Sequence, residues 1–326
     1  MNRHYGIIST ATIVPRFIQA LQANGDIVVA IASRTYDKAK QIADRFAIKK
    51  AYASYEELYC DDEIEIVYIA TANHTHYDEV MNALKHHKHV LVEKPFALSS
   101  EQALEMFRYA KKQNCFLMEA QKSVFLPATI QLKKLIQQKT LGECQQISMM
   151  SSFPNAYPKD HWMYTANGGV LNGSASYTIE YLMYLFDNPA IEIQAAVDSA
   201  ETGAIIDAGI HLVLNDHLLA DSHITMKVKT DNAAVFYFDK GYIRVENYWK
   251  ARKLLLYPYD KAMQEYNFPV DYEMIYEAAH VDECLSRQLI VSPVMSCERT
   301  ILCTQLVEQL VNEANEPLNK RKADKS

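Results

Sequence analysis

The sequence predicts an α/β fold for the first part of the chain and an α+β domain for the rest. From residue 5 to about residue 120, short apolar runs that suit buried strands alternate with segments whose apolar residues recur at helical spacing. This alternation implies a doubly wound parallel sheet with helices on both faces, an architecture of the Rossmann type. Later strands alternate apolar with polar residues, which indicates a mostly antiparallel sheet. The predicted domains are residues 1–120 and 121–326.

The first domain is expected to begin with a strand. Local signals mark its helices: Gly25 closes the first helical pattern, Ser54 with Glu57 forms a capping box, and Ser99 can cap the last helix. Strands are expected at 5–8, 27–32, 64–70, 90–92 and 115–118, and helices begin near 13, after 34, after 54, near 77 and after 99.

The second domain is expected to open with an amphipathic helix from about 128 to 141 and to close with two helices, 272–287 and 297–312. An antiparallel sheet with one open face often becomes a subunit interface, so we expect a homodimer through this C-terminal sheet. Its strands are expected at 147–152, 191–197, 208–214, 223–228, 233–238 and 241–245.

Composition is that of an ordinary globular protein. Of 326 residues, 49% are hydrophobic and 22% are charged, and the net charge of −7 disfavours nucleic acid as the main partner. No apolar run approaches the roughly 20 residues that span a bilayer, and the N-terminus lacks a signal-peptide pattern. The six cysteines are scattered, as expected of reduced thiols in a cytoplasmic protein.

A first candidate site lies where the apolar run Val90–Val92 stops at Glu93-Lys94-Pro95. Pro95 cannot continue a sheet ladder, so two charged residues stand at the carboxyl end of a buried strand. Ligands of open parallel sheets bind at that edge. Lys94 can therefore act as an acid, a base or a hydrogen-bond donor to a substrate hydroxyl. The alternative is a solvated strand end without a function.

The turn after the first strand lacks the glycines of a dinucleotide-binding fingerprint. The register of G-x-G-x-x-G falls on Ser9, Ala11 and Val14. Ser9 and Ala11 are nevertheless small enough for a phosphate to approach the backbone, and the hydroxyls of Ser9 and Thr10 can donate hydrogen bonds. A helix N-terminus also offers free N–H groups and a favourable dipole. A plain strand–turn–helix remains the alternative.

The end of the second strand predicts which dinucleotide is preferred. An NAD site places Asp or Glu there for the ribose 2′-hydroxyl, whereas this chain has Ser33-Arg34, with Lys38 one turn later. A guanidinium can pair with a 2′-phosphate. NADP is therefore predicted over NAD, which stays possible because Arg34 can also be an ordinary surface residue.

These motifs together resemble the Gfo/Idh/MocA family of oxidoreductases, and the dimeric dihydrodiol dehydrogenase-like branch most closely. The resemblance covers nearly the whole chain. Its anchors are the turn 6–13, Ser33-Arg34, the segment 71–76, Glu93-Lys94-Pro95, Met118-Glu119-Ala120 and Gly168-Gly169.

The resemblance implies which residues surround the cofactor. It places Asn73, His76, Glu93 and Lys94 around the nicotinamide, with Lys94 reaching the substrate. One departure is Ala72, where the family usually has Pro. For His76 the alternative is a packing residue at a helix start. The expected cofactor-binding set is Ser9, Thr10, Ala11, Ile13, Ser33, Arg34, Lys38, Thr71, Asn73, His76, Glu93 and Lys94.

The resemblance also implies a catalytic segment after Gly168-Gly169. Family members show an Asp and, four residues later, a His or Tyr; here these positions are Gly173 and Tyr177. Four residues are about one helical turn, so both positions face the same way. Tyr177 can donate and accept a proton if a nearby cation lowers its pKa, and Lys94 is such a cation. The alternative for Tyr177 is a half-buried helix tyrosine.

Three further residues are expected to contact substrate. Asn172 is a possible substitute for the missing Asp, and Trp162 can line the pocket or belong to the core. Relatives carry an Arg where this chain has Val124, and Lys122 can take over its charge. We predict no metal site, because His74, His86, His87 and His89 have no convincing metal partner in the sequence.

The resulting hypothesis is an NADP-dependent oxidoreductase that acts on a small sugar, polyol or cyclic diol, with Lys94 and Tyr177 as catalytic residues. One alternative is a cofactor-binding regulator with the same fold and no turnover, which the missing glycines and Gly173 favour. A retained pair of Lys94 and Tyr177 argues against it. An unrelated sugar-binding module is a third possibility, which Ser33-Arg34 together with Glu93-Lys94-Pro95 disfavours.

Overall fold

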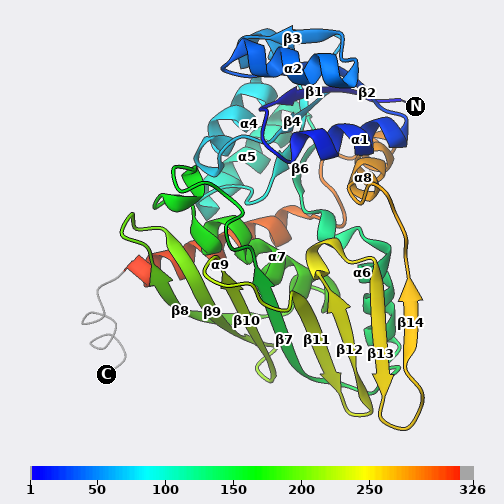
Figure 1. Ribbon diagram of the computed structural model, residues 1–326. Helices are drawn as coiled ribbons and strands as arrows, with labels where there is room; N and C mark the ends of the chain where they lie inside the picture. The colour runs from blue at the N-terminus through cyan, green and yellow to red at the C-terminus, as the bar shows by residue number, and fades with distance from the viewer. Residues whose placement is uncertain (1, 316–326) are drawn as a thin grey trace. The chain divides into compact units, whose positions relative to one another are not determined.

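The structure is a computed structural model that describes residues 2–315 (Figure 1). The chain divides into two compact units. Unit 1 comprises the residues up to 125 together with 270–301, and unit 2 comprises 126–269 and the residues from 302 onward. The predicted division has a single boundary at 120/121. The observed division differs from it mainly because the segment 270–301 returns to unit 1.

Segment 270–301 joins unit 1 through apolar packing and one sheet edge. Its helix α8 (Ile275–Ser286) packs on α1 (Val14–Asn24). Farther along, the Leu117 N–H donates a hydrogen bond to the carbonyl of Ile290 at 3.1 Å. The sequence does not reveal this return, because the apolar face of a helix fits the surface of either domain.

Unit 1 is built on a six-stranded parallel sheet in the order β3-β2-β1-β4-β5-β6. The order reverses between β1 and β4, and in open α/β sheets ligands bind at the carboxyl ends beside such a reversal. This sheet confirms the predicted Rossmann-type fold; only the short β3 has no counterpart in the prediction. The strands are β1 (His4–Ile8), β2 (Ile27–Ala32), β3 (Lys50–Tyr52), β4 (Ile66–Ile69), β5 (His89–Glu93) and β6 (Leu117–Ala120).

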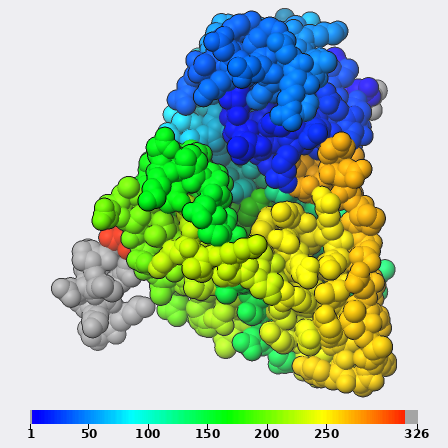
Figure 2. All heavy atoms as spheres, in the orientation of Figure 1, coloured from blue at the N-terminus to red at the C-terminus, as the bar shows by residue number. Residues whose placement is uncertain are grey.

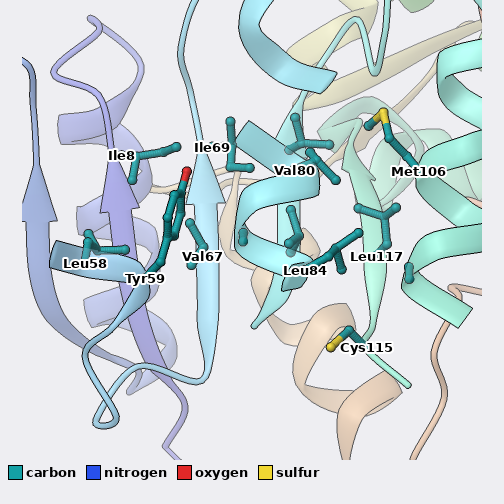
Figure 3. Packing of buried hydrophobic residues seen from close by; sticks show 14 of the residues in the cluster. Ile8, Leu58, Tyr59, Val67, Ile69, Val80, Leu84, Met106, Cys115 and Leu117 are labelled. Carbon is teal, nitrogen blue, oxygen red and sulfur yellow. The ribbon is translucent and has the colours of Figure 1, made fainter. Parts of the chain in front are cut away.

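Helices cover both faces of this sheet. Phe17 of α1 stacks on Tyr68 of β4, whereas Val67 and Ile69, which flank Tyr68 on the strand, point to the opposite face. That opposite face packs against α3 (Tyr55–Tyr59), α4 (His76–Lys85) and α5 (Ser100–Gln113) (Figure 3). Its labelled core residues are Ile8, Leu58, Tyr59, Val67, Ile69, Val80, Leu84, Met106, Cys115 and Leu117.

The predicted helix ends are confirmed by their capping bonds. Ser54 Oγ accepts from the Glu57 N–H at 3.3 Å, and Ser99 Oγ accepts from the Gln102 N–H at 3.2 Å. Gly25 closes α1 with φ of +91°, a left-handed conformation that glycine adopts without strain. The remaining helix of the first half is α2 (Tyr36–Phe46), which packs on β2.

Unit 2 holds an eight-stranded sheet in the order β14-β13-β12-β11-β7-β10-β9-β8, antiparallel except between β10 and β7. This sheet confirms the predicted α+β second domain. Its strands are β7 (Cys144–Ser152), β8 (Ile191–Ser199), β9 (Ile205–Leu214), β10 (Leu218–Thr225), β11 (Ala233–Phe238), β12 (Gly241–Glu246), β13 (Lys253–Pro258) and β14 (Gln264–Asn267).

Some strands of unit 2 differ from the prediction. The strand predicted at 223–228 runs from Leu218 to Thr225 instead, because Asn215 and Asp216 form a tight turn with positive φ angles of 49° and 64°. That turn brings Leu218 opposite Leu214 and fixes the register. The edge strand β14 and its neighbour β13 were not predicted.

One face of this sheet is covered by helix and the other is open. Helix α7 (Gly169–Leu185) packs on β9 and β10. The strands β7 and β10–β12 are seen from their open face in Figures 1 and 2. One row of side chains crosses this face from strand to strand in register: Leu219, Gln146, Tyr237, Tyr242 and Tyr257.

The other helices are α6 (Pro127–Gln137) and α9 (Cys297–Asn315). Within residues 2–315 no helix has the length and apolarity needed to cross a membrane.

Candidate cofactor and catalytic site

The β1–α1 turn keeps a glycine-like backbone without a glycine. Ser9 has φ of +114°, in the region that L side chains rarely adopt. Its hydroxyl accepts a hydrogen bond from the Ala11 N–H at 3.0 Å, and its own N–H donates to Ala32 O at 3.0 Å. The side chain thus holds the conformation that a fingerprint glycine would adopt freely.

The same turn presents backbone donors to a possible phosphate. The N–H groups of Thr12 and Ile13 have no acceptor among the described residues, and Ile13 is the N-cap residue of α1. Pro15 occupies the first turn of the helix, where its missing N–H removes no internal bond. These free donors and the helix dipole fit a dinucleotide pyrophosphate, although the glycines are missing.

At the end of β2, Ser33 is buried while Arg34 and Lys38 are exposed. Ser33 Oγ accepts from the Thr35 N–H at 3.3 Å, which shapes the turn into α2. Burial raises the pKa of the Glu79 carboxyl, and the nearby Arg34 guanidinium opposes that rise. Ser33 and Arg34 therefore occupy the strand end at which an NAD site usually has an acid, and Asp37 follows in the first turn of α2, just before Lys38.

The end of β4 is tied to the end of β5 by His76. The His76 ring is fully buried, with Nδ1 2.8 Å from Pro95 O and Nε2 3.2 Å from Thr71 O. Burial lowers the pKa of His76, and the hydrogen bonds to the two backbone carbonyls oppose that shift. Both ring nitrogens face backbone carbonyls. The geometry thus favours the packing alternative for His76 over direct contact with nicotinamide, and Asn73 beside it is also buried.

The end of β5 carries the predicted charged pair. The Tyr68 hydroxyl donates to Glu93 Oε1 at 2.6 Å, and Phe17 stacks on the Tyr68 ring with centroids 3.9 Å apart. Glu93 is thereby oriented by a side chain that the sequence did not mark as functional. Lys94, which is partly exposed, follows at the strand end and precedes a cis peptide bond to Pro95.

Buried acids on the returning segment form a second group near these residues. Glu277 is fully buried, and neither carboxylate oxygen has a hydrogen-bond partner among the described residues. Burial raises the Glu277 pKa well above its usual range, the Glu93 charge adds to this, and Lys122 opposes it. Lys122 is only 7% exposed and also lies near Glu273, which pairs with Arg16. This setting favours internal charge compensation for Lys122 over the predicted substrate contact.

In unit 2, the Gly168-Gly169 pair is required by close backbone packing. A Cβ on Gly168 would lie 2.5 Å from Trp162 O, and one on Gly169 would lie 2.5 Å from Ile205 O. Gly169 also has φ of +78°. Larger residues at either position would displace the start of α7, which carries the predicted catalytic tyrosine.

Helix α7 places Tyr177 on its least buried side. Of the 17 residues of α7, only Ser174, Tyr177 and Tyr184 are not buried. At the position of the family's Asp, a Cβ on Gly173 would lie 2.7 Å from Met163 Cε and 3.1 Å from Met163 Sδ. The Met163 side chain therefore occupies the space of the missing side chain.

The two other predicted substrate residues also lie in unit 2. Asn172 is buried on α7, immediately before Gly173. Trp162 is half-buried and its ring lies 5.5 Å from that of His161, which in turn stacks on Tyr157. Their roles toward a substrate stay predictions, as do those of Tyr177 and Lys94.

Comparison with known proteins decides the family. Residues 3–121 match the oxidoreductase family model described as an NAD-binding Rossmann fold, and residues 129–244 match the Gfo/Idh/MocA C-terminal domain. The trans-1,2-dihydrobenzene-1,2-diol dehydrogenase of Xenopus laevis is 30% identical over 98% of both chains. The mouse protein of the same name is 31% identical over 95% of this chain and 96% of its own. The chain belongs to the Gfo/Idh/MocA family.

Two solved oxidoreductase structures share the fold. A 3-ketoreductase from Actinomadura kijaniata, solved with NADP and TDP-benzene, superposes with a TM-score of 0.87 at 22% identity and covers 96% of this chain and 98% of its own. A levoglucosan dehydrogenase, solved with NADH and levoglucosan, has a TM-score of 0.85 at 18% identity and covers 96% and 97%.

Family membership confirms several predictions. The chain is an oxidoreductase with an NAD(P)-binding Rossmann domain, and the dihydrodiol dehydrogenase-like branch is the one that its curated relatives represent. The residues that the sequence did not point to are Tyr68, Glu273 and Glu277. No sequence pattern distinguishes these three residues. Tyr68 has the features of an ordinary strand residue, and the two acids lie about 150 residues beyond the end of the domain to which they return.

Proposed function

We propose that this chain is an NADP-dependent oxidoreductase that transfers a hydride between nicotinamide and a small sugar, polyol or cyclic diol. The observation that carries the cofactor preference is the exposed Arg34 directly after β2, at the strand end where an NAD site has Asp or Glu, with Lys38 one turn later. A guanidinium there suits a 2′-phosphate, whereas an acid would suit a free ribose hydroxyl. The substrate class is supported by the names of the relatives, a dehydrogenase of a cyclic dihydrodiol among them.

In the proposed reaction, a bound nicotinamide would take the hydride from a carbinol carbon of the substrate. The hydroxyl proton passes to Tyr177, so that the carbon–oxygen bond becomes a carbonyl. Lys94 donates a hydrogen bond to the same oxygen. The cofactor supplies the hydride chemistry, and these side chains orient the substrate and carry its proton. The position of Tyr177 on the least buried side of α7, where its side chain is only half-buried, supports this role.

A titration with NADPH and with NADH, followed by nicotinamide fluorescence, tests the cofactor preference. NADPH should bind more tightly to the native chain. The variant Arg34→Ala should lose about tenfold or more in NADPH affinity and change little toward NADH, because a phosphate–guanidinium pair is worth more than about 1.4 kcal/mol. Arg45→Ala is the control, because Arg45 lies at the far end of α2 and its guanidinium contacts Phe46.

Two results would contradict the proposal. Equal affinities for NADPH and NADH would remove the NADP preference, and the chain would remain an oxidoreductase of the same family. An Arg34→Ala variant that loses affinity for both cofactors equally would show that Arg34 contacts a part that both share.

The open face of the unit 2 sheet supports a homodimer. Leu219 and Tyr237 are exposed on it, and the Tyr242 and Tyr257 rings stack with centroids 4.6 Å apart, so the face offers an aromatic row of three tyrosines, with Leu219 beyond Gln146. Light scattering should give twice the chain mass for the native protein and the monomer mass for Tyr242→Asp. A native protein that is monomeric in solution would exclude the proposed homodimer.

The six free cysteines support a cytoplasmic location.

A further inference from the structure

We propose that Glu56, Cys60 and His86 form a binding site on unit 1 for a borderline-soft divalent cation such as Zn²⁺. A carboxylate oxygen, a thiol sulfur and an imidazole nitrogen from these residues all lie within 4.8 Å of one another. The site is separate from the residues to which cofactor and catalytic roles are assigned. Its test does not depend on the proposed reaction.

Two short elements bring the three side chains together. Glu56 and Cys60 stand four residues apart on α3 and its C-cap, so both project from the same side of one helical turn. His86 is the C-cap residue of α4. Leu58 and Tyr59 anchor α3 in the core shown in Figure 3, while Leu84 anchors α4 in the same cluster. The ligand-bearing residues therefore rest on a rigid base although their side chains reach solvent.

The distances suit a single ion. Glu56 Oε1 lies 3.1 Å from His86 Nε2 and 3.9 Å from Cys60 Sγ. Zinc bonds of about 2.0–2.3 Å in tetrahedral geometry separate neighbouring ligand atoms by roughly 3.3–3.7 Å. Small rotations of exposed side chains are enough to reach that arrangement, and a water molecule would complete the fourth position.

The His86 ring is already oriented as a ligand. Its Nδ1 lies 2.9 Å from the carbonyl of Asn82, which can only accept a hydrogen bond, and its Nε2 faces Glu56 Oε1 at 3.1 Å. The ring also stacks on buried Tyr59, with centroids 5.7 Å apart at 23°. A backbone carbonyl that fixes the second nitrogen is the usual outer partner of a metal-bound histidine.

The donor set selects the class of cation. A thiolate with an imidazole favours Zn²⁺ and similar ions over Mg²⁺ or Ca²⁺, which prefer oxygen ligands only. Binding forms a metal–sulfur bond and releases the Cys60 thiol proton to solvent, with no change in oxidation state.

Sequence spacing hides this site. His86 lies 26 residues after Cys60, and neither has a second cysteine or histidine at zinc-finger spacing. The prediction of no metal site rested on that spacing. Only the packing of α3 beside the end of α4 shows that His86 has metal-binding neighbours.

The experiment uses the full chain, free of any affinity tag and with reduced thiols, titrated with Co²⁺ and then with Zn²⁺. One Co²⁺ per chain should produce a thiolate-to-cobalt absorption band, and Zn²⁺ should abolish it by displacement. Cys60→Ser should lose the band. His86→Gln and Glu56→Gln should each lower Co²⁺ affinity by about tenfold or more, since even an outer-shell change of a metal site has effects of that size.

Matched controls separate this site from other donors. Cys144→Ser removes another partly exposed thiol, and His87→Gln removes the neighbouring exposed imidazole; both should keep the band. Circular dichroism checks that each variant is folded, and Zn²⁺ should raise the thermal midpoint of the native chain and leave that of Cys60→Ser unchanged. The proposal is overturned if Co²⁺ gives no thiolate band or if the band survives in Cys60→Ser.

Discussion

The turn 9–13 of unit 1 and the start of α7 in unit 2 both depart from the family pattern, but in opposite ways. In the turn, Ser9 replaces a glycine and still adopts a glycine-like φ of +114°. In α7, Gly173 replaces an acid, and the space beside it holds Met163. The proposed role of the turn is to bind phosphate through backbone N–H groups, and the Ser9 hydroxyl can hold that backbone in place. The helix works through side chains, and a missing side chain cannot be replaced by backbone geometry.

The largest expected effect tests the side chains of helix α7. Tyr177→Phe should lower turnover by about 10²–10⁴-fold, the usual contribution of a general acid–base, and leave NADPH affinity unchanged. Tyr184→Phe on the same helix is the control, because Tyr184 is also half-buried and carries no proposed role. Steady-state kinetics with any substrate found by screening provide the measurement, and equal turnover in both variants would exclude Tyr177.

A second change asks whether Met163 occupies the place of the missing acid. Gly173→Asp should lower the free energy of unfolding by about 1–3 kcal/mol, because the new side chain meets Met163 in a packed interior. Urea unfolding of Gly173→Asp, Met163→Ala and the double variant measures the coupling. The double variant should be more stable than the sum of the two single effects predicts. Additive effects would mean that the two residues do not compete for space.

The segment 270–301 provides a pH-dependent test within unit 1. Burial raises the pKa of Asp282 to about 7, and the neighbouring Asp26 carboxylate adds to the rise. Asn24 Nδ2 donates to both acids, at 2.9 Å to Asp26 and 3.0 Å to Asp282. Since the folded state binds the proton more tightly than the unfolded state, stability should fall as pH rises from about 4 to 7.

The variant Asp282→Asn should remove that pH dependence. At pH 8 it should be more stable than the native chain by about 1–2 kcal/mol, a figure reduced for the partial exposure of the pair, and the difference should vanish near pH 4. Asp62→Asn, at an exposed position of the same unit, is the control. Urea midpoints at three pH values measure this, and a native chain whose stability is flat over this range would contradict the raised pKa.

The smallest effect concerns the turn. Ser9→Ala keeps the unfavourable positive φ and loses the hydrogen bond from the Ala11 N–H. Ser9→Gly loses the same hydrogen bond but removes the strain, because glycine adopts a positive φ freely. Ser9→Gly should therefore be more stable than Ser9→Ala by about 1 kcal/mol. Thermal unfolding compares the two. The reverse order would mean that the backbone does not hold this conformation in solution.

Sequence patterns were sufficient for most of the fold, because buried strands and amphipathic helices are local features. The strand 27–32 and the capping bonds of Ser54 and Ser99 occur where propensity and hydrogen-bonding capacity place them. The strand predicted at 223–228 was misplaced because the turn at Asn215-Asp216 sets its register. The edge strand β14 is polar and short, so it lacks a clear period.

The sequence by itself determined the strand ends that carry Ser33-Arg34 and Glu93-Lys94, because such ends follow from local apolar runs and breakers. It also determined the family, because each family motif is a short local pattern and the order of the motifs can be read directly along the chain. Tertiary structure alone decided that Tyr68 orients Glu93, that His76 is buried against two carbonyls, and that Cys60 and His86 meet. The physical reason is distance along the chain. The contacts of Tyr68 with Glu93, of His76 with Pro95 and of Cys60 with His86 join residues 19 or more positions apart, and no local pattern encodes the packing that makes them.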